Sequence, residues 1–133
     1  MFTRIVVGAA ESDAARTAID TAVDLARVTG AELHLVLAFD PYLDRIEPET
    51  RPGSAHAMEF LESVAASAGD LTTRVHPAAG DPAEVILGVA RDVDADLIVV
   101  GNKGMQGPAR ILGSVTNTVS HHAPCSLLIV STT

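Results

Sequence analysis

The residues best suited to chemistry are glycines and a serine in the C-terminal half of the chain. Gly101 directly follows the apolar stretch 97–100, Gly104 comes three positions later, and Gly113-Ser114 comes nine positions after Gly104. Glycines expose backbone N–H groups, and a Gly-Ser pair where a helix begins adds a hydroxyl beside the positive end of the helix dipole. This spacing predicts a phosphate-binding loop. A Gly-x-x-Gly after a strand is also common as a plain turn, so both interpretations stand at this point.

A second group of reactive side chains, His121, His122 and Cys125, is poor evidence for a catalytic or metal site. Adjacent residues on a helix point about 100° apart, so the two histidines do not face one another. The negative end of the helix dipole explains histidines in a last helical turn, and no carboxylate lies nearby in sequence to complete a zinc site. We expect Cys125 to be a packed thiol. We predict that the protein is not an enzyme; weak ATP hydrolysis stays open, with Glu11 as its one candidate base.

The composition is that of one globular domain, residues 1–133. Apolar residues make up 47% of the chain and charged residues 20%, and aromatic residues are few, which suits helices packed on a parallel sheet. The formal net charge of −8 disfavours nucleic acid and anionic membranes as partners. One cysteine cannot form an internal disulfide, and no stretch has the length of a membrane span or the apolar core of a signal peptide. We therefore expect a cytoplasmic protein.

Apolar stretches alternate with amphipathic ones along the whole chain. Strands are expected at residues 5–7, 33–39, 72–76, 97–100 and 126–130, and helices at 13–29, 54–68, 82–93 and 114–122. This order predicts an α/β fold, an open five-stranded parallel sheet with helices on both faces. Ligands bind such sheets beyond the carboxyl ends of the strands, where the winding direction reverses. If the first and fourth strands are central neighbours, the loops 8–12 and 101–114 line one crevice.

Several residues predict local features. Ser12 and Asp81 are suited to cap the helices that follow them, and Gly30 is suited to end the first helix. His34 is interpreted as a residue of the sheet face or core edge rather than a ligand. The segment from residue 40 to residue 53 is too long for a plain connection, and we expect it to fold over a site or contact a partner.

Four stretches together resemble the universal stress protein family over essentially the whole chain. They are residues 5–12, 80–86, 96–104 and 113–125, of which the last is the most specific. The resemblance implies a sheet in the order 3-2-1-4-5, an adenine nucleotide α-hydrolase-like fold, and a cytoplasmic homodimer that is often paired through the last strands. In one branch of the family it also implies ATP or AMP binding.

That branch carries the pattern G-x2-G-x9-G-[S/T], and here the middle spacing is one residue short. By resemblance, the backbone of Gly101 and Gly104 and the hydroxyl of Ser114 contact phosphates, and Asn102 and Gly113 line the same cleft. No catalytic residue and no metal beyond a nucleotide-bound Mg are implied. The predicted cofactor-binding residues are Gly8, Ala9, Ala10, Val36, Gly101, Asn102, Lys103, Gly104, Gly113, Ser114 and Val115.

The loop after the first strand departs from this pattern. Ala10 stands where nucleotide-binding members typically have Asp, and Glu11, where a glycine is usual, places a negative charge near the predicted phosphates. Lys103 and Arg110 offset that charge if they turn inward. Two functions stay open: a nucleotide-binding regulatory module of the stress response that acts as a homodimer, and a dimeric scaffold of the same family that no longer binds nucleotide.

The last strand predicts the dimer contact. Residues 127–130 are all apolar, and an edge strand of that kind is prone to aggregation unless something covers it. Pairing with the same strand of a second subunit covers it. The expected partners are therefore an adenine nucleotide and a second copy through Leu127 to Val130, with no nucleic acid and no membrane.

Overall fold

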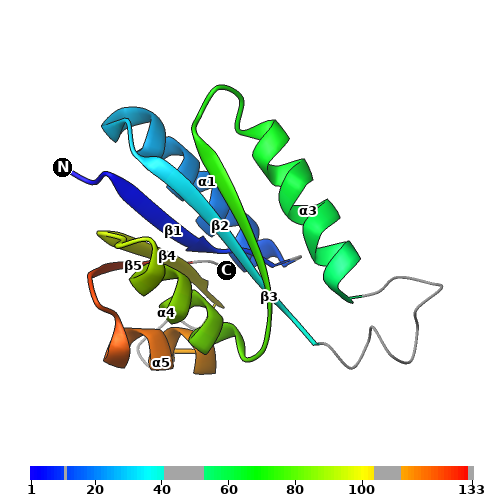
Figure 1. The fold of residues 1–133 in the computed structure, drawn as a ribbon. Coiled ribbons are helices and arrows are strands. Elements are labelled where there is room, and N and C mark those ends of the chain that lie inside the picture. The colour runs from blue at the N-terminus through cyan, green and yellow to red at the C-terminus, as the bar shows by residue number, and fades with distance from the viewer. Residues whose placement is uncertain (11, 41–52, 104–111, 132–133) are drawn as a thin grey trace.

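The structure is a computed structural model that describes residues 1–10, 12–40, 53–103 and 112–131. The alternation of strands and helices expected from the sequence is confirmed throughout these residues (Figure 1). The elements are β1 (Arg4–Gly8), α1 (Asp13–Thr29), β2 (Glu32–Phe39), α3 (Gly53–Ser67), β3 (Thr73–Ala79), α4 (Pro82–Asp92), β4 (Leu97–Asn102), α5 (Ser114–His122) and β5 (Ser126–Ser131).

The five strands are parallel and lie in the order β3-β2-β1-β4-β5, as predicted. The first and fourth strands are central neighbours, with Ile5 opposite Leu97 and Val7 opposite Val99. The half-polar β3 is an edge strand, and a free edge tolerates Pro77, which has no N–H to donate. The other edge is β5.

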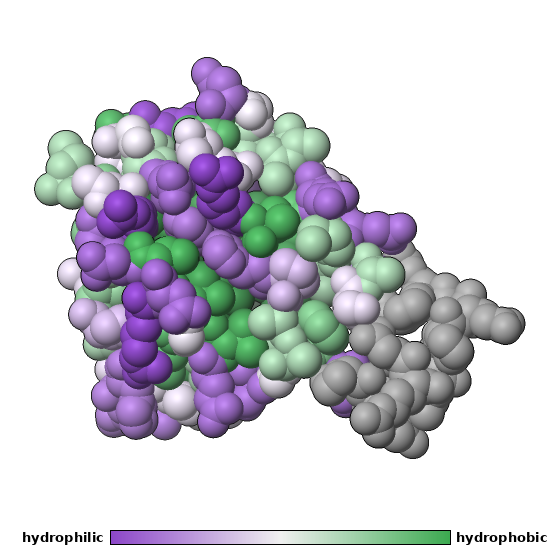
Figure 2. Space-filling view, viewed as in Figure 1, coloured by the Kyte–Doolittle hydropathy of each residue, from purple (hydrophilic) through white to green (hydrophobic). Residues whose placement is uncertain are grey.

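Successive strand residues point to opposite faces, and helices bury both faces. On one face, α4 and α5 cover a cluster that includes Val6, Val36, Ile98 and Val100 from the strands and Ile86 from α4. Figure 2, viewed as in Figure 1, shows an apolar area in the middle of the visible surface with hydrophilic residues around it. Several apolar residues packed against this cluster are only partly buried, among them Val89, Val93, Leu127 and Ile129.

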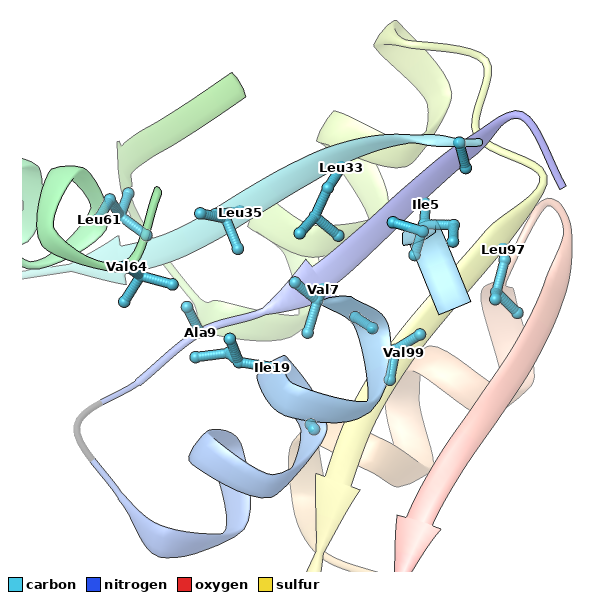
Figure 3. Close-up of a cluster of buried hydrophobic side chains, with 14 residues drawn as sticks. Ile5, Val7, Ala9, Ile19, Leu33, Leu35, Leu61, Val64, Leu97 and Val99 are labelled. Atoms are coloured by element: carbon cyan, nitrogen blue, oxygen red, sulfur yellow. The ribbon is translucent and has the colours of Figure 1, made fainter. Parts of the chain in front are cut away.

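On the other face, α1 and α3 cover the larger cluster drawn in Figure 3. Ile5, Val7, Leu33 and Leu35 project from β1 and β2 toward the two helices, and all four are fully buried. Alanines at helical spacing on α1 let that helix lie close to the sheet. Two buried faces explain why the strands read as continuous apolar stretches in the sequence.

The predicted caps are present. The Ser12 hydroxyl oxygen accepts a hydrogen bond from the N–H of Ala15 at 3.2 Å, and an oxygen of Asp81 accepts one from the N–H of Glu84 at 3.2 Å. Gly30 ends α1 with φ 76°, a left-handed conformation that glycine adopts without strain. These local signals fix where α1 and α4 begin, at the carboxyl edge of the sheet.

Two predicted strand ends were off by more than one residue. The third strand was expected to end at residue 76, but β3 continues to Ala79 because it pairs with β2 as far as Phe39. We expected the fourth strand to stop at Gly101, but β4 continues through Gly101 and Asn102. The reason is β5, which is long enough to pair with both: Val130 lies opposite Gly101, and Ser131 lies opposite Asn102. Gly101 is therefore part of the sheet as well as the start of the predicted loop.

A carboxylate ties β1 to the chain that enters β4. Asp96 accepts hydrogen bonds from the backbone N–H of Thr3 at 2.8 Å, the hydroxyl of Thr3 at 3.1 Å and the backbone N–H of Arg4 at 3.0 Å. Burial alone would raise the pKa of Asp96, but these hydrogen bonds outweigh it and hold the pKa below its ordinary value. The amino ends of the two central strands are thus clamped by one side chain.

Some expectations lie outside the described residues. They are the role of residues 41–52 as a cover or partner site, the negative charge of Glu11, and the contributions of Gly104 and Arg110. Within the described ranges, no helix is both long enough and apolar enough to cross a membrane.

Candidate functional site

A cavity of about 270 Å³ lies at the carboxyl ends of the central strands. This is the edge where ligands bind in open parallel sheets, because neighbouring strands lead their chains to opposite faces there. The volume lies near the lower end of the range of about 300–1,000 Å³ that is usual for small-molecule sites. Its described lining consists of Gly8, Ala9, Ala10, Ser12, Ala14, Ala15, Val36, Ala38, Pro82, Ile86, Val100, Gly101 and Val115.

Two glycines let helices approach the strand tips from which the cavity is built. A Cβ on Gly101 would collide with the backbone oxygen of Ala14, so the first turn of α1 rests directly on β4. A Cβ on Gly8 would come within 2.8 Å of Cδ1 of Ile86, which is the far end of a side chain on α4 rather than backbone. Gly101 therefore has a packing reason to be glycine, whether or not its backbone meets a ligand.

The side chains around the cavity are small and apolar. Among the described lining residues there is no charged side chain, and Ser12 is the one with a polar side chain. The Ser12 oxygen accepts from Ala15 N–H, which leaves its own O–H proton able to donate to a ligand. The N–H of Ala9 already donates to the carbonyl of Val36 at 2.7 Å. Such a wall suits a planar apolar group such as a nucleobase.

Three helices begin beside this cavity. Ser12 and Ala14 line it at the start of α1, Pro82 at the start of α4, and Val115 at the start of α5. The amino end of a helix carries unpaired N–H groups and a partial positive charge. Anions bind at such ends, so the converging helices offer an anion a favourable field although the lining has no basic side chain.

Polar side chains behind the cavity fix the start of α5. Asn102 is 4% exposed, and its Oδ1 accepts a hydrogen bond from the N–H of Gly113 at 2.8 Å. The buried Thr116 hydroxyl donates to the carbonyl of Gly101 at 3.4 Å. Asn102 and Thr116 therefore fix the Gly113 end of the predicted glycine loop and the start of α5 at the tip of β4.

The structure brings six of the predicted site residues together around the cavity: Gly8, Ala9, Ala10, Val36, Gly101 and Val115. Four others, Asn102, Lys103, Gly113 and Ser114, do not line it, and their contact with a ligand stays a prediction. Lys103, Gly113 and Ser114 are exposed, whereas Gly104 lies outside the described residues.

Sequence reasoning missed the part of the wall that α4 and the end of β2 supply. Ala38, Pro82 and Ile86 line the cavity, and so does Ala14 of α1. The sequence did contain a signal for this part of the wall. Asp81-Pro82 predicted a helix start directly after the third strand. Because all parallel strands end at the same edge of the sheet, that helix start had to lie at the same edge as the two strand-tip loops.

The histidine and cysteine group at the end of α5 shows no catalytic geometry. His121 and His122 are exposed, and His122 Nδ1 donates to the backbone carbonyl of Thr118 at 3.1 Å. Cys125 is half-buried against the α4–α5 cluster, and burial, followed by the charge of Asp96, raises the pKa of its thiol. A raised pKa makes the thiol a poor nucleophile.

Comparison with known proteins agrees with the fold. The Universal stress protein family profile matches residues 1–131. Universal stress protein Rv1636 of Mycobacterium tuberculosis is 34% identical over 147 aligned positions, covering 99% of this chain and 98% of the relative. A universal stress protein solved in complex with cAMP is 31% identical, covers 99% of each chain and has a TM-score of 0.78.

A more distant structure shares the fold. It is a family protein from Arabidopsis thaliana with AMP bound, 19% identical over 98% of this chain and 92% of its own, with a TM-score of 0.77. The strand order, the cavity at the switch point and the family profile over nearly the whole length lead to one conclusion: this chain belongs to the universal stress protein family.

Proposed function

We propose that this protein binds an adenine nucleotide at the carboxyl ends of its central strands and acts as a regulatory module of the stress response. The observation that carries the proposal is the cavity of about 270 Å³ at which α1, α4 and α5 begin. The 31% identical family member solved in complex with cAMP supports the same ligand class. AMP and ATP are the nucleotides expected from the sequence.

The lining suggests how such a ligand is held. The base packs against the apolar wall of Val36, Ala38 and Ile86, where burial of its ring is favourable. The phosphate lies toward the amino ends of the helices, with the Ser12 hydroxyl as a donor. The backbone of Gly101 and Gly104 and the hydroxyl of Ser114 are the further phosphate contacts expected from the sequence.

The proposal is for binding rather than catalysis. A hydrolytic site needs a nucleophile or a general base near the reacting phosphate. No carboxylate, imidazole or thiol is among the described residues that line the cavity. Nucleotide occupancy then acts through the shape or assembly of the protein.

A thermal melt with and without ligand tests nucleotide binding. A nucleotide at 100 times its dissociation constant stabilises the fold by about 2.7 kcal/mol, which raises Tm by about 10 °C for a chain of this size. We expect such a shift with at least one of ATP, AMP and cAMP. The variant Ala38→Phe, which puts a ring into the cavity, should abolish the shift, whereas Ala79→Phe at the exposed end of β3 should keep it.

The absence of any shift would favour the second function, a scaffold that has lost its nucleotide. The observation in its favour is Ala10, which lines the cavity without a polar group to hold a ribose. The two functions differ in this one measurement, because both keep the same fold and the same proposed assembly.

We also propose that β5 pairs with its counterpart in a second subunit. The strand lies at the sheet edge, and Leu127 to Val130 are all only partly buried in the single chain. Covering this edge removes unpaired backbone groups and apolar surface from water. Sedimentation at micromolar concentration should give a dimer for the wild type and a monomer for Ile129→Asp. The matched change on the opposite edge, Val75→Asp, should leave the dimer intact; a monomeric wild type contradicts the proposal.

A further inference from the structure

A partly buried chain of three titratable side chains links β2 to the edge strand β3. His34 on β2 is 3% exposed. Its Nε2 lies 2.7 Å from Oε1 of Glu32 on the same strand, and its Nδ1 lies 2.8 Å from Nε2 of His76 on β3. The two rings are 5.1 Å apart between centroids. Both nitrogens of His34 are therefore used, and the cavity described above is not involved.

The hydrogen-bond chemistry of this chain sets how many protons it can hold. An ionised carboxylate only accepts, so the hydrogen on the first bond belongs to His34 Nε2. The second bond needs one hydrogen between His34 Nδ1 and His76 Nε2. When both rings are neutral, His76 supplies it.

A single added proton leaves both bonds in place. If it goes to His76 Nδ1, the His76 cation still donates to His34. If it goes to His34 Nδ1, His76 moves its hydrogen from Nε2 to Nδ1, and the His34 cation then donates to both neighbours. A second added proton has no such place, because two N–H groups would then face each other across 2.8 Å. Two adjacent cations would also repel in a partly buried site.

The surroundings of His76 disfavour a second added proton on the pair of rings. Burial, followed by the influence of His34, lowers the pKa of His76, whereas Asp92 at the end of α4 raises it by a smaller amount. Glu32 faces the pair from β2, and Arg74 occupies the β3 register position opposite His34. Within the described ranges, no three His, Cys, Asp or Glu side chains are grouped to hold a metal ion, so a metal site does not explain the arrangement.

We propose that Glu32, His34 and His76 form an acid-sensitive link between β2 and β3, which holds with no more than one added proton and opens when both rings are protonated. β3 has a strand neighbour on one side only, so opening the link loosens the edge of the sheet. This inference goes beyond the proposed function and needs no nucleotide, so it can succeed or fail independently.

The first test measures urea unfolding at a series of pH values from 8 to 5 without ligand. The unfolded chain binds two protons on these histidines and the folded chain one, so the unfolding equilibrium constant should rise up to about tenfold per pH unit below pH ~6.5. His76→Gln keeps an N–H donor for His34 but removes one proton site, and it should lose this extra slope. His121→Gln, a change at an exposed histidine, should keep the wild-type slope.

Equal slopes for the wild type and His76→Gln would overturn the proposal. A second measurement on the wild type covers the case in which the variant does not fold. Nitrogen-15 NMR of the imidazoles should show Nε2–H tautomers for His34 and His76 at pH 8, and hydrogen exchange in β3 should accelerate at pH 5 relative to β1. Full protonation of both rings with β3 protection unchanged would equally overturn it.

Discussion

The two ends of the central strand pair are built from different kinds of contact. At the amino ends, Asp96 binds Thr3 and Arg4 through three hydrogen bonds. At the carboxyl ends, the contacts are the close approach of Gly101 to Ala14 and the partly buried hydrogen bond from Gly113 to Asn102, with a cavity beside them. The difference teaches that one carboxylate holds the amino ends of the two strands together, whereas small residues at the other end leave room for a ligand.

The largest effect should come from breaking the carboxyl end at Gly101. Gly101→Ala places a Cβ against the Ala14 carbonyl, and relief requires a shift of α1. We expect a loss of about 3 kcal/mol in the free energy of unfolding, measured by urea denaturation. Gly88→Ala is the matched control: nothing lies within 4 Å of the added Cβ, and alanine in a helix should stabilise by up to about 1 kcal/mol. Similar effects of the two changes would contradict the packing account.

The next effect tests the link between the tip of β4 and α5. Asn102→Ala leaves the N–H of Gly113 without its acceptor in a partly buried position, and it should cost about 2 kcal/mol of unfolding free energy. It should also weaken any nucleotide binding, because the start of α5 is no longer fixed. The control Asn117→Ala changes an exposed residue of α5 and should be nearly neutral. A neutral Asn102→Ala would mean that α5 is held by other contacts.

The third prediction adds a polar side chain to the cavity at Ala10. Ala10→Asp provides an acceptor for ribose hydroxyl groups at a lining position where the family resemblance leads us to expect Asp. We expect AMP affinity to rise about tenfold, which corresponds to 1.4 kcal/mol. Calorimetric titration measures it, and Ala10→Asn separates hydrogen bonding from charge. Unchanged affinity would place the ribose away from Ala10.

The smallest effect concerns the amino end. Asp96→Asn keeps the size of the side chain but loses its charge, and it should cost about 1 kcal/mol at pH 7, since these hydrogen bonds are exposed to water. The folded pKa of Asp96 lies below its ordinary value, so its contribution is present at neutral pH and is lost as the pH falls below about 4. Urea unfolding at pH 7 and at pH 3 should show the variant and wild type converging. Parallel curves would assign the effect to another group.

Local signals made most of the fold predictable from the sequence. The caps at Ser12, Gly30 and Asp81 define helix ends without reference to the rest of the molecule. The extension of β4 through Asn102 was not predictable in this way, because it depends on how far β5 reaches beside it.

The site was only partly predictable for a similar reason. The two strand-tip loops were expected to meet, and Gly8, Ala10 and Gly101 do line one cavity. The role of Ile86 depends on how α4 lies across β1, and the bond between His34 and His76 depends on the register of β2 and β3. Both features depend on how separate elements are placed relative to one another, which the residues of a single element do not determine.

The contact between Gly101 and Ala14 has a mechanical consequence. The backbone of α1 touches the tip of β4 with no side chain between them to absorb a displacement. α1 has 17 residues, which at 1.5 Å per residue makes a stiff rod of about 25 Å. A movement of the β4 tip toward α1 therefore requires the first turn of α1 to move with it.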